Sequence, residues 1–128
     1  MAGKIIGSAG ILLVNDVVAA ANYYRDKLGF QYDRFWDEPP GFVILRRDDH
    51  YVMLRRVDDP TKVVPHWKVV HGMWNLYFWV DDVDAIYAEM QERGAIIDYH
   101  LEVKDYGVKE FGVQDLDGHD IAFGQIIG

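Results

Sequence analysis

The sequence predicts an α+β fold in which two βαβββ modules form a curved mixed sheet around a cavity, with the helices on its outer face. The main observation is an internal repeat: the segment 14–17, Val-Asn-Asp-Val, matches the segment 80–83, Val-Asp-Asp-Val. In both places an apolar run comes before the matching segment, and a helical pattern that ends at a glycine comes after it. Because a period of about half the chain is typical of a duplicated supersecondary unit, we expect a single domain made of two repeats.

The first repeat is expected at about residues 8–57. The apolar run 9–16 is predicted to be a strand, and Asp16 is a residue type that caps helix N-termini. Helical spacing then continues to Gly29, which is expected to end the helix. The apolar stripe of that helix comprises Val17, Ala20, Ala21, Tyr24 and Leu28. Turn residues divide the rest of the repeat into three expected strands, at 30–37, 42–47 and 51–57.

The second repeat is expected at about residues 74–126. An apolar strand runs from Asn75 to Val80, and the following helix should end at Gly94. The expected stripe of this helix is Val83, Ile86, Tyr87 and Met90, and three strands are expected at 96–104, 108–114 and 119–126. Residues 58–73 are interpreted as a crossing loop between the repeats. Since neither repeat could bury its helix and its sheet alone, we expect the two to pack together.

The composition excludes several classes of protein. The 128 residues suffice for one domain, and they contain neither a long apolar run typical of a membrane span nor a credible signal peptide. The absence of cysteine excludes disulfides and thiol catalysis, and it fits a cytoplasmic protein. The net charge of −8 arises wholly in residues 65–128, where four Lys and Arg face twelve Asp and Glu. Such a surface disfavours nucleic acid and is compatible with a cationic ligand.

The order of these motifs resembles the vicinal-oxygen-chelate superfamily. The residues that carry the likeness are Asn15-Asp16 at the first helix start, Leu28-Gly29-Phe30 at its end, and Asp115-Leu116-Asp117-Gly118-His119 before the last strand. That superfamily includes glyoxalases, extradiol dioxygenases, fosfomycin-modifying enzymes and bleomycin-resistance proteins. The likeness extends from about Ser8 to Gln125, and it implies the fold. Because this one scaffold supports several chemistries, the function has to be inferred from the residues of the site.

The resemblance also implies four positions for metal ligands. In this chain they correspond to Ala9, Asn75, Ala122 and either Met53 or Leu54. None is a histidine or a carboxylate, and a single amide oxygen cannot hold a divalent ion, so no metal cofactor is expected. The five histidines are expected at the surface or in turns; they are His50, His66, His71, His100 and His119. A divalent metal ion held by relocated ligands stays as the alternative.

Aromatic side chains then dominate the expected ligand groove. If Asn75 faces the concave side, strand alternation places Tyr77 and Trp79 there as well. The same alternation assigns Ile11, Leu13 and Ala122 to the groove, and Trp36 and Trp67 are expected at its rim. Aromatic faces stack on planar rings and attract cations.

Within the superfamily, the pattern is most similar to the bleomycin-resistance branch, which lacks the metal ligands and sequesters a drug. In that branch a Trp-Gly-x-Glu-Phe segment lines the groove, and here Tyr106 stands in place of the tryptophan, ahead of Glu110. The resemblance implies a homodimer with ligand grooves between subunits. Considered on its own, Glu110 is expected to be a solvated strand residue or part of an ion pair, rather than a general base.

The favoured hypothesis is therefore a metal-independent small-molecule binding protein that sequesters an aromatic or cationic ligand, such as a bleomycin-class antibiotic. The alternative is a metal-dependent lyase, isomerase or dioxygenase of the same superfamily. A third hypothesis, a domain that acts only through protein partners, predicts a collapsed groove. No nucleic-acid or membrane partner is expected.

Overall fold

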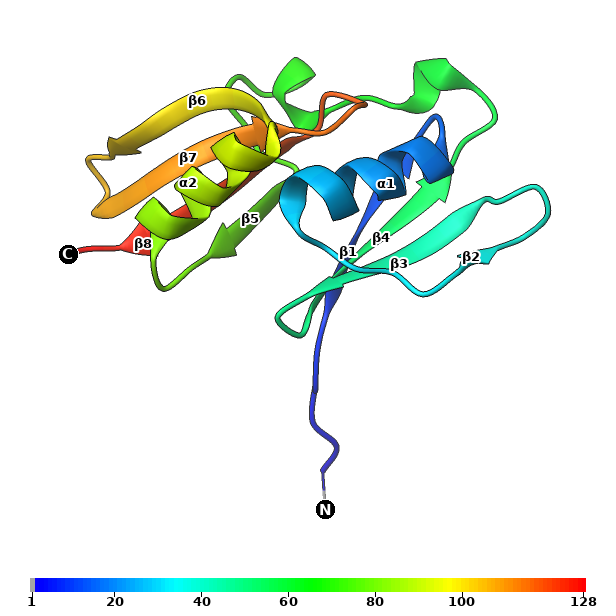
Figure 1. The fold of residues 1–128 in the computed structure, drawn as a ribbon, viewed down its shortest axis with the longest axis horizontal. Helices are drawn as coiled ribbons and strands as arrows, with labels where there is room; N and C mark the ends of the chain where they lie inside the picture. The colour runs from blue at the N-terminus through cyan, green and yellow to red at the C-terminus, as the bar shows by residue number, and fades with distance from the viewer. Residues whose placement is uncertain (1) are drawn as a thin grey trace.

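The computed structural model describes residues 2–128 and confirms the α+β fold of two βαβββ modules (Figure 1). Each module contributes one helix and four strands in the same order, as the internal repeat predicts. The elements of the first module are β1 (Ala9–Val14), α1 (Val17–Leu28), β2 (Phe35–Trp36), β3 (Phe42–Arg47) and β4 (His50–Arg56). Those of the second are β5 (Leu76–Trp79), α2 (Val83–Arg93), β6 (Ile96–Val103), β7 (Val108–Gln114) and β8 (Asp120–Ile126). The intervening loop contains two short 3-10 turns, Pro60–Lys62 and His66–Lys68.

Hydrogen bonding divides the strands into two mixed sheets of identical topology. Sheet A has the order β1-β4-β3-β2 and sheet B the order β5-β8-β7-β6. In each sheet the first strand of the module runs parallel to the last, and the other pairs are antiparallel. Both helices lie on the same side of the sheets (Figure 1). We call the opposite, helix-free side of each sheet its open face.

Both helices begin and end where the sequence predicts. The Asp16 carboxylate accepts a hydrogen bond from the Ala19 amide, and the Asp82 carboxylate accepts one from Ala85. Gly29 and Gly94 end the helices in the left-handed conformation, which a glycine adopts without steric cost. All five residues of the expected α1 stripe are buried. The α2 stripe likewise packs on the core, with two of its residues fully buried.

The predicted strand 30–37 is wrong in length. Only Phe35–Trp36 pairs as β2, and Gln31 forms one isolated bridge with Arg46. Asp33 and Arg34 lie between these two pairings at the edge of the sheet, where no further strand holds the chain in the ladder. Aspartate is depleted in strands, so this segment leaves the ladder and rejoins it briefly.

The two modules share one core and are joined by buried polar contacts. The Tyr24 hydroxyl donates to Asp115 Oδ2 at 2.8 Å, which ties α1 to the turn before β8. Arg47 donates to both carboxylate oxygens of Glu89 on α2. Burial raises the pKa of Asp115. The pKa of the Tyr24 hydroxyl is raised well above its ordinary value, first by burial and then by the nearby Asp115 charge.

His119 follows the turn before β8, as the sequence predicts, but unlike the other four histidines it is buried there. Its side chain is 3% exposed, and its ring Nε2 lies 2.8 Å from the Leu13 carbonyl oxygen, to which it donates. Its backbone amide donates to Asp115. The turn lies against the end of β1, which local sequence cannot show, so packing between modules explains the burial.

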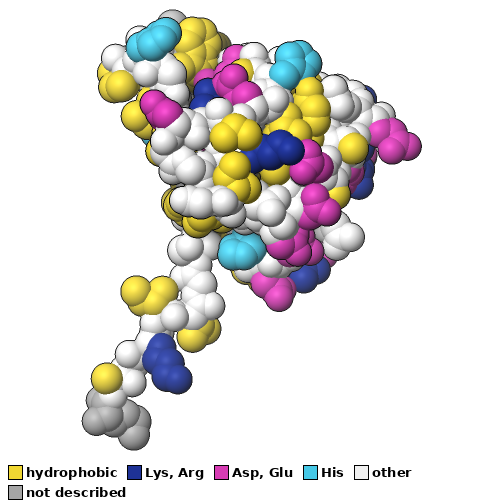
Figure 2. All heavy atoms as spheres, turned by 90° about the vertical axis from the view of Figure 1, so that its left-hand side faces the viewer, with side chains coloured by type: hydrophobic (Ala, Val, Ile, Leu, Met, Phe, Trp, Pro, Cys, Tyr) yellow, Lys and Arg dark blue, Asp and Glu magenta, His cyan; other side chains and the backbone are white. Residues whose placement is uncertain are grey.

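The N-terminal segment before β1 projects from the body of the molecule (Figures 1 and 2). Ile5 and Ile6 in this segment are almost fully exposed. No helix within residues 2–128 is long and apolar enough to cross a membrane.

Candidate functional site

The open face of sheet B carries the aromatic residues predicted for the groove. Tyr77 pairs with Ala122, and Trp79 pairs with Gly124 on β8. The alternate residue Phe78 packs instead against the core, where its ring stacks on Phe123 at 5.6 Å between centroids. The alternation expected for this strand is therefore present in the structure.

Glu110 lies on the same face and is completely buried. Three tyrosine hydroxyls donate to its carboxylate: Tyr77 at 2.9 Å, Tyr99 at 2.5 Å and Tyr106 at 2.5 Å. The expectation of a solvated or ion-paired residue was wrong, because three phenols replace both water and a basic partner. We call these four residues the Glu110 cluster.

The pKa values of all three phenols in the Glu110 cluster are raised. Burial is the largest cause for each, and the hydrogen bond to Glu110 is the second. Ionising a phenol would break its hydrogen bond and place a second negative charge beside the carboxylate. The cluster therefore keeps its hydroxyls protonated, as donors that hold the rings in fixed positions.

Two glycines make room for the tyrosine rings. A Cβ at Gly112 would lie 2.3 Å from Tyr99 Cε1, and one at Gly124 would lie 2.1 Å from the Tyr77 hydroxyl. Both distances are far below van der Waals contact, and Tyr99 is directly opposite Gly112 in the ladder. The open face of sheet B thus has no side chains at these two positions, so the tyrosine rings can lie against the backbone and reach Glu110.

A row of rings continues from the Glu110 cluster. Trp74 lies edge-on to Tyr77 at 4.8 Å, and Tyr77 lies 5.1 Å from Trp79. Trp79 is 68% exposed and Tyr106 is 53% exposed, so both present ring surface to solvent. Sequence reasoning missed Trp74 and Tyr99. The Trp74 indole N–H donates to the Tyr99 hydroxyl, a contact between segments 25 residues apart that strand alternation cannot indicate.

The other predicted groove residues lie in several places. Ile11 and Leu13 are 62% and 41% exposed on the open face of sheet A, and Ala122 is buried. Asn75 comes just before β5, and its side-chain oxygen accepts the His66 amide at 3.1 Å. Asn75 therefore holds the crossing loop.

The two tryptophans predicted for the rim lie in other surroundings. Trp36 packs on Phe42 at the outer edge of sheet A, with the Arg34 guanidinium over its ring. The Trp67 indole N–H donates to the Gly118 carbonyl at 2.6 Å. Within residues 2–128, no aromatic contact joins either ring to Tyr77 or Trp79.

The residues at the superfamily's metal positions do not fit a divalent ion. Register places Met53 beside Ile11 on the open face of sheet A, whereas Leu54 is buried in the core. The four positions thus hold two alanines, a thioether and an amide already engaged by His66. Across the described part of the chain, no group of three or more His, Cys, Asp or Glu side chains could hold a metal.

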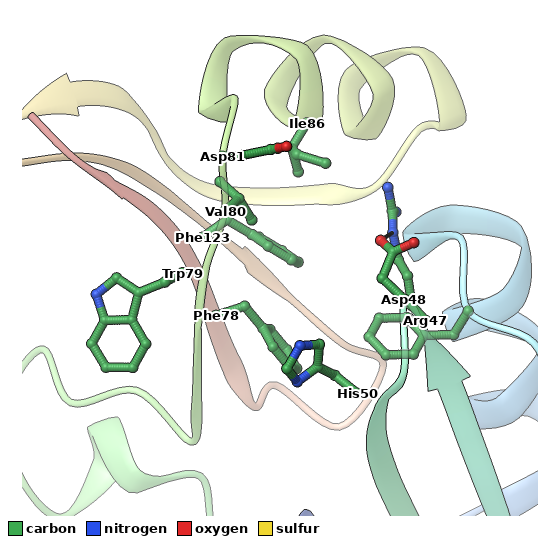
Figure 3. Close-up of a pocket in the computed structure, with 10 residues that line it drawn as sticks. Arg47, Asp48, His50, Phe78, Trp79, Val80, Asp81, Ile86 and Phe123 are labelled. Carbon is green, nitrogen blue, oxygen red and sulfur yellow. Dashed lines mark ion pairs between the residues drawn. The ribbon is translucent and has the colours of Figure 1, made fainter. Parts of the chain in front are cut away.

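A separate cavity of about 280 Å³ lies between the modules (Figure 3). Its wall includes the rings of Phe78 and Phe123, while Arg47 and His50 approach from the β3–β4 hairpin. Trp79 borders this cavity, but its ring points away from it (Figure 3). The exposed ring of Trp79 therefore belongs to the open face of sheet B.

Comparison with known proteins agrees with this fold. The family model described as Glyoxalase/Bleomycin resistance protein/Dioxygenase superfamily matches residues 5–123. The chain belongs to this superfamily. No curated protein matches it in sequence.

Solved structures of this fold cover nearly the whole chain. TioX from Micromonospora sp. ML1 is 23% identical, with a TM-score of 0.74 over 94% of this chain and 98% of that one. A bleomycin-binding protein from Streptomyces verticillus, complexed with copper(II)-bleomycin, is 25% identical, with a TM-score of 0.69 over 99% of both chains. A glyoxalase-related enzyme from Clostridium phytofermentans is 13% identical, with a TM-score of 0.76 over 98% of each.

Proposed function

We propose that this superfamily member is a metal-independent binding protein that sequesters a planar, cationic small molecule on the open face of sheet B. The observation that carries the proposal is the Glu110 cluster beside the exposed ring of Trp79. Three phenols hold a buried carboxylate in place, while two large rings remain free to contact a ligand. Such rigidity suits binding, because little side-chain entropy is lost when a ligand arrives.

A planar cation matches the chemistry of this face. Ring stacking contributes about 0.5–1.5 kcal/mol, and a cation over an aromatic face adds about 0.5–2 kcal/mol. The Glu110 carboxylate accepts hydrogen bonds from three hydroxyl groups, and from below the rings it would attract a positively charged ligand. Acidic side chains also gather along one side of the molecular face shown in Figure 2.

A bleomycin-class antibiotic is our choice of ligand. Its support is the bleomycin-binding protein, which is 25% identical and aligned over 99% of both chains. In this chain Tyr106 and Trp79 would supply the stacking rings. The composition leads us to place this sequestration in the cytoplasm.

We further propose that two copies of the chain build the complete groove. Ile11 and Leu13 expose apolar surface on sheet A, and Trp79 does so on sheet B. A twofold dimer that covers sheet B of one copy with sheet A of the other would bury all three side chains and make two equivalent grooves. The dimer is tested by sedimentation velocity, in which a purely monomeric chain at micromolar concentration would contradict it.

The binding proposal is tested by calorimetric titration with copper(II)-bleomycin and with metal-free bleomycin. We expect both forms to bind, and we expect Trp79→Ala to weaken binding at least tenfold while Trp79→Phe retains most of it. Val69→Ala, which truncates an exposed side chain in the crossing loop, is the matched control. Equal affinity of Trp79→Ala and the unmodified protein would contradict the role of Trp79.

Metal independence needs its own measurement. Elemental analysis of the purified protein, followed by titration with nickel, zinc, manganese and anaerobic ferrous iron, should show no stoichiometric tight binding. Tight binding of any of these ions would instead favour the metal-dependent lyase, isomerase or dioxygenase.

A further inference from the structure

Asp120 is a buried acid on the open face of sheet B. It precedes the core residue Ile121 on β8, so its side chain lies on the same face as the Glu110 cluster. The residue is only 5% exposed, and its Oδ1 atom has no hydrogen-bond partner within residues 2–128. Burying an acceptor without a hydrogen-bond donor costs free energy of folding. A ligand that donated a hydrogen bond to this oxygen would remove that cost.

A second carboxyl group lies beside it because of an irregularity in β6. Ile97 pairs with Val113 and Tyr99 pairs with Gly112, so Asp98 is an extra residue between two consecutive pairings. Asp98 is exposed, and although β7 lies between the strands of the two residues, its carboxyl group reaches Asp120 as a charged, hydrogen-bonding neighbour. Burial and the neighbouring Asp98 raise the pKa of Asp120 to about 6.

The other groups around Asp120 do not neutralise the pair. Gln114, its partner on β7, stabilises the charged form, whereas the Asp115 carboxyl adds further negative charge. No lysine or arginine among the described residues forms an ion pair with Asp98 or Asp120. The pair therefore combines like charges with an unpartnered oxygen, and one N–H cation would relieve both.

We propose that Asp98 and Asp120 form a second polar subsite, which binds an amidinium or ammonium group of the same ligand whose planar part stacks on Trp79. The inference rests on the proposed function, since it concerns the same open face. Asp98 is exposed and gives the cation a route to the subsite, and the cation offsets the negative charge of both carboxyl groups.

The sheet also sets the length of the ligand. Asp120 and Gly124, which pairs with Trp79, are four residues apart on β8, or about 13 Å along an extended strand. Tyr77, opposite Ala122, lies about halfway. The subsite thus selects an elongated molecule that carries its cationic group about 13 Å, roughly three phenyl ring lengths, from the stacked ring.

The test uses two rigid probes of equal shape and a length that spans this distance, p-terphenyl-4-carboxamidine and the neutral p-terphenyl-4-carboxamide. Titrations at pH 8 should show the amidine binding about tenfold more tightly than the amide, since a bidentate charged hydrogen bond replaces a neutral one. Asp120→Asn and Asp98→Asn should remove this preference without weakening the amide. Trp79→Ala should weaken both probes. At pH 5 the preference should shrink, because protons then compete for the pair.

The possible failures are distinguishable. If both probes bind equally to the unmodified protein, or the preference survives in both Asn variants, the subsite is wrong and the stacking face stands. If neither probe binds, the proposed function and the subsite both fail.

A measurement without ligand tests the carboxyl pair itself. The folded-state pKa of Asp120, about 6, lies above its ordinary value of 3.8, so the folded chain binds the proton more readily between these values. The charged carboxylate therefore lowers stability above pH 6. Asp120→Asn should raise the urea midpoint at pH 8, with a smaller gain at pH 5. The control Asp58→Asn, at a fully exposed side chain, should change neither. An equal gain in the urea midpoint at both pH values would contradict the proposed pairing of the Asp98 and Asp120 carboxyl groups.

Discussion

The two sheets have the same strand order and differ in what their open faces carry. Sheet A presents the exposed aliphatic side chains of Ile11 and Leu13, with Arg55 opposite Leu13 in the ladder. Sheet B presents a buried carboxylate, Glu110, held by three phenols, with exposed rings beside it. The two modules of a duplicated scaffold can therefore have different roles. Sheet A offers apolar contact surface, whereas sheet B offers charged and hydrogen-bonding groups in fixed positions.

The helices of the two modules also differ, in the number of residues that each buries. Six residues of α1 are buried, against two of α2. The second module covers α1, because Tyr23 donates to the Gln114 carbonyl and Tyr24 donates to Asp115. Part of the burial of the first module is therefore due to contacts with the second.

The largest effect is expected where the modules meet. Asp115→Ala should lower the free energy of unfolding by about 3 kcal/mol, since it leaves the buried Tyr24 hydroxyl and two backbone amides without their acceptor. Urea unfolding measures this loss. Asp117→Ala removes an exposed acceptor of Asn15 and should cost less than about 1 kcal/mol. Equal losses would mean that the buried contact does not hold the modules together.

The next largest loss of stability is expected at Gly112, on the open face of sheet B. Gly112→Ala should cost about 2 kcal/mol, because the new Cβ displaces the Tyr99 ring from Glu110. Gly10→Ala on β1 is the comparison in sheet A. Gly10 lies on the core-facing side, opposite the buried Val52, and its Cβ would meet only the end of the flexible Leu76 side chain. We expect a smaller loss there. Thermal unfolding of both variants measures the two losses, and a larger loss for Gly10→Ala would contradict the importance of the Tyr99 contact with the backbone at Gly112.

Glu110→Gln should lower stability by about 1–2 kcal/mol while keeping the side-chain shape. It should also lower the pKa of the three cluster phenols, measured by ultraviolet absorbance during an alkaline titration. Because these folded-state pKa values are raised, the stability they contribute is complete below pH 10 and is lost as the pH rises further. Glu92→Gln, at an exposed position on α2, is the control. Unchanged phenol titration would show that Glu110 does not govern the rings.

The smallest effect on folding is expected on the open face of sheet A. Ile11→Ser combined with Leu13→Ser should change the unfolding free energy of the single chain by less than about 1 kcal/mol, since both side chains are largely exposed. The same change should abolish self-association in sedimentation velocity. Val69→Ser, also exposed but in the crossing loop, should leave association intact. Persistent dimers of the double variant would remove sheet A from the interface.

Local pattern determined much of the scaffold. The repeat, the helix caps at Asp16 and Asp82 and the alternation of Tyr77, Phe78 and Trp79 depend on neighbours within a few residues, so the sequence predicts them correctly. The exception is the strand 30–37, where an edge position allowed the chain to leave the ladder between Gln31 and Phe35.

Only the tertiary structure decided the environment of the polar side chains. The sequence indicates an ordinary strand residue for Glu110 and a turn residue for His119, yet both are buried, as is Asp120 on the open face of sheet B. Their surroundings come from distant segments: Tyr77 reaches Glu110, β1 reaches His119, and a bulge in β6 brings Asp98 to Asp120. Burial depends on which segments meet in space, whereas caps and alternation depend on the chain itself. The sequence by itself therefore determined the two-module scaffold and its family, and long-range packing decided which of its polar groups became a site.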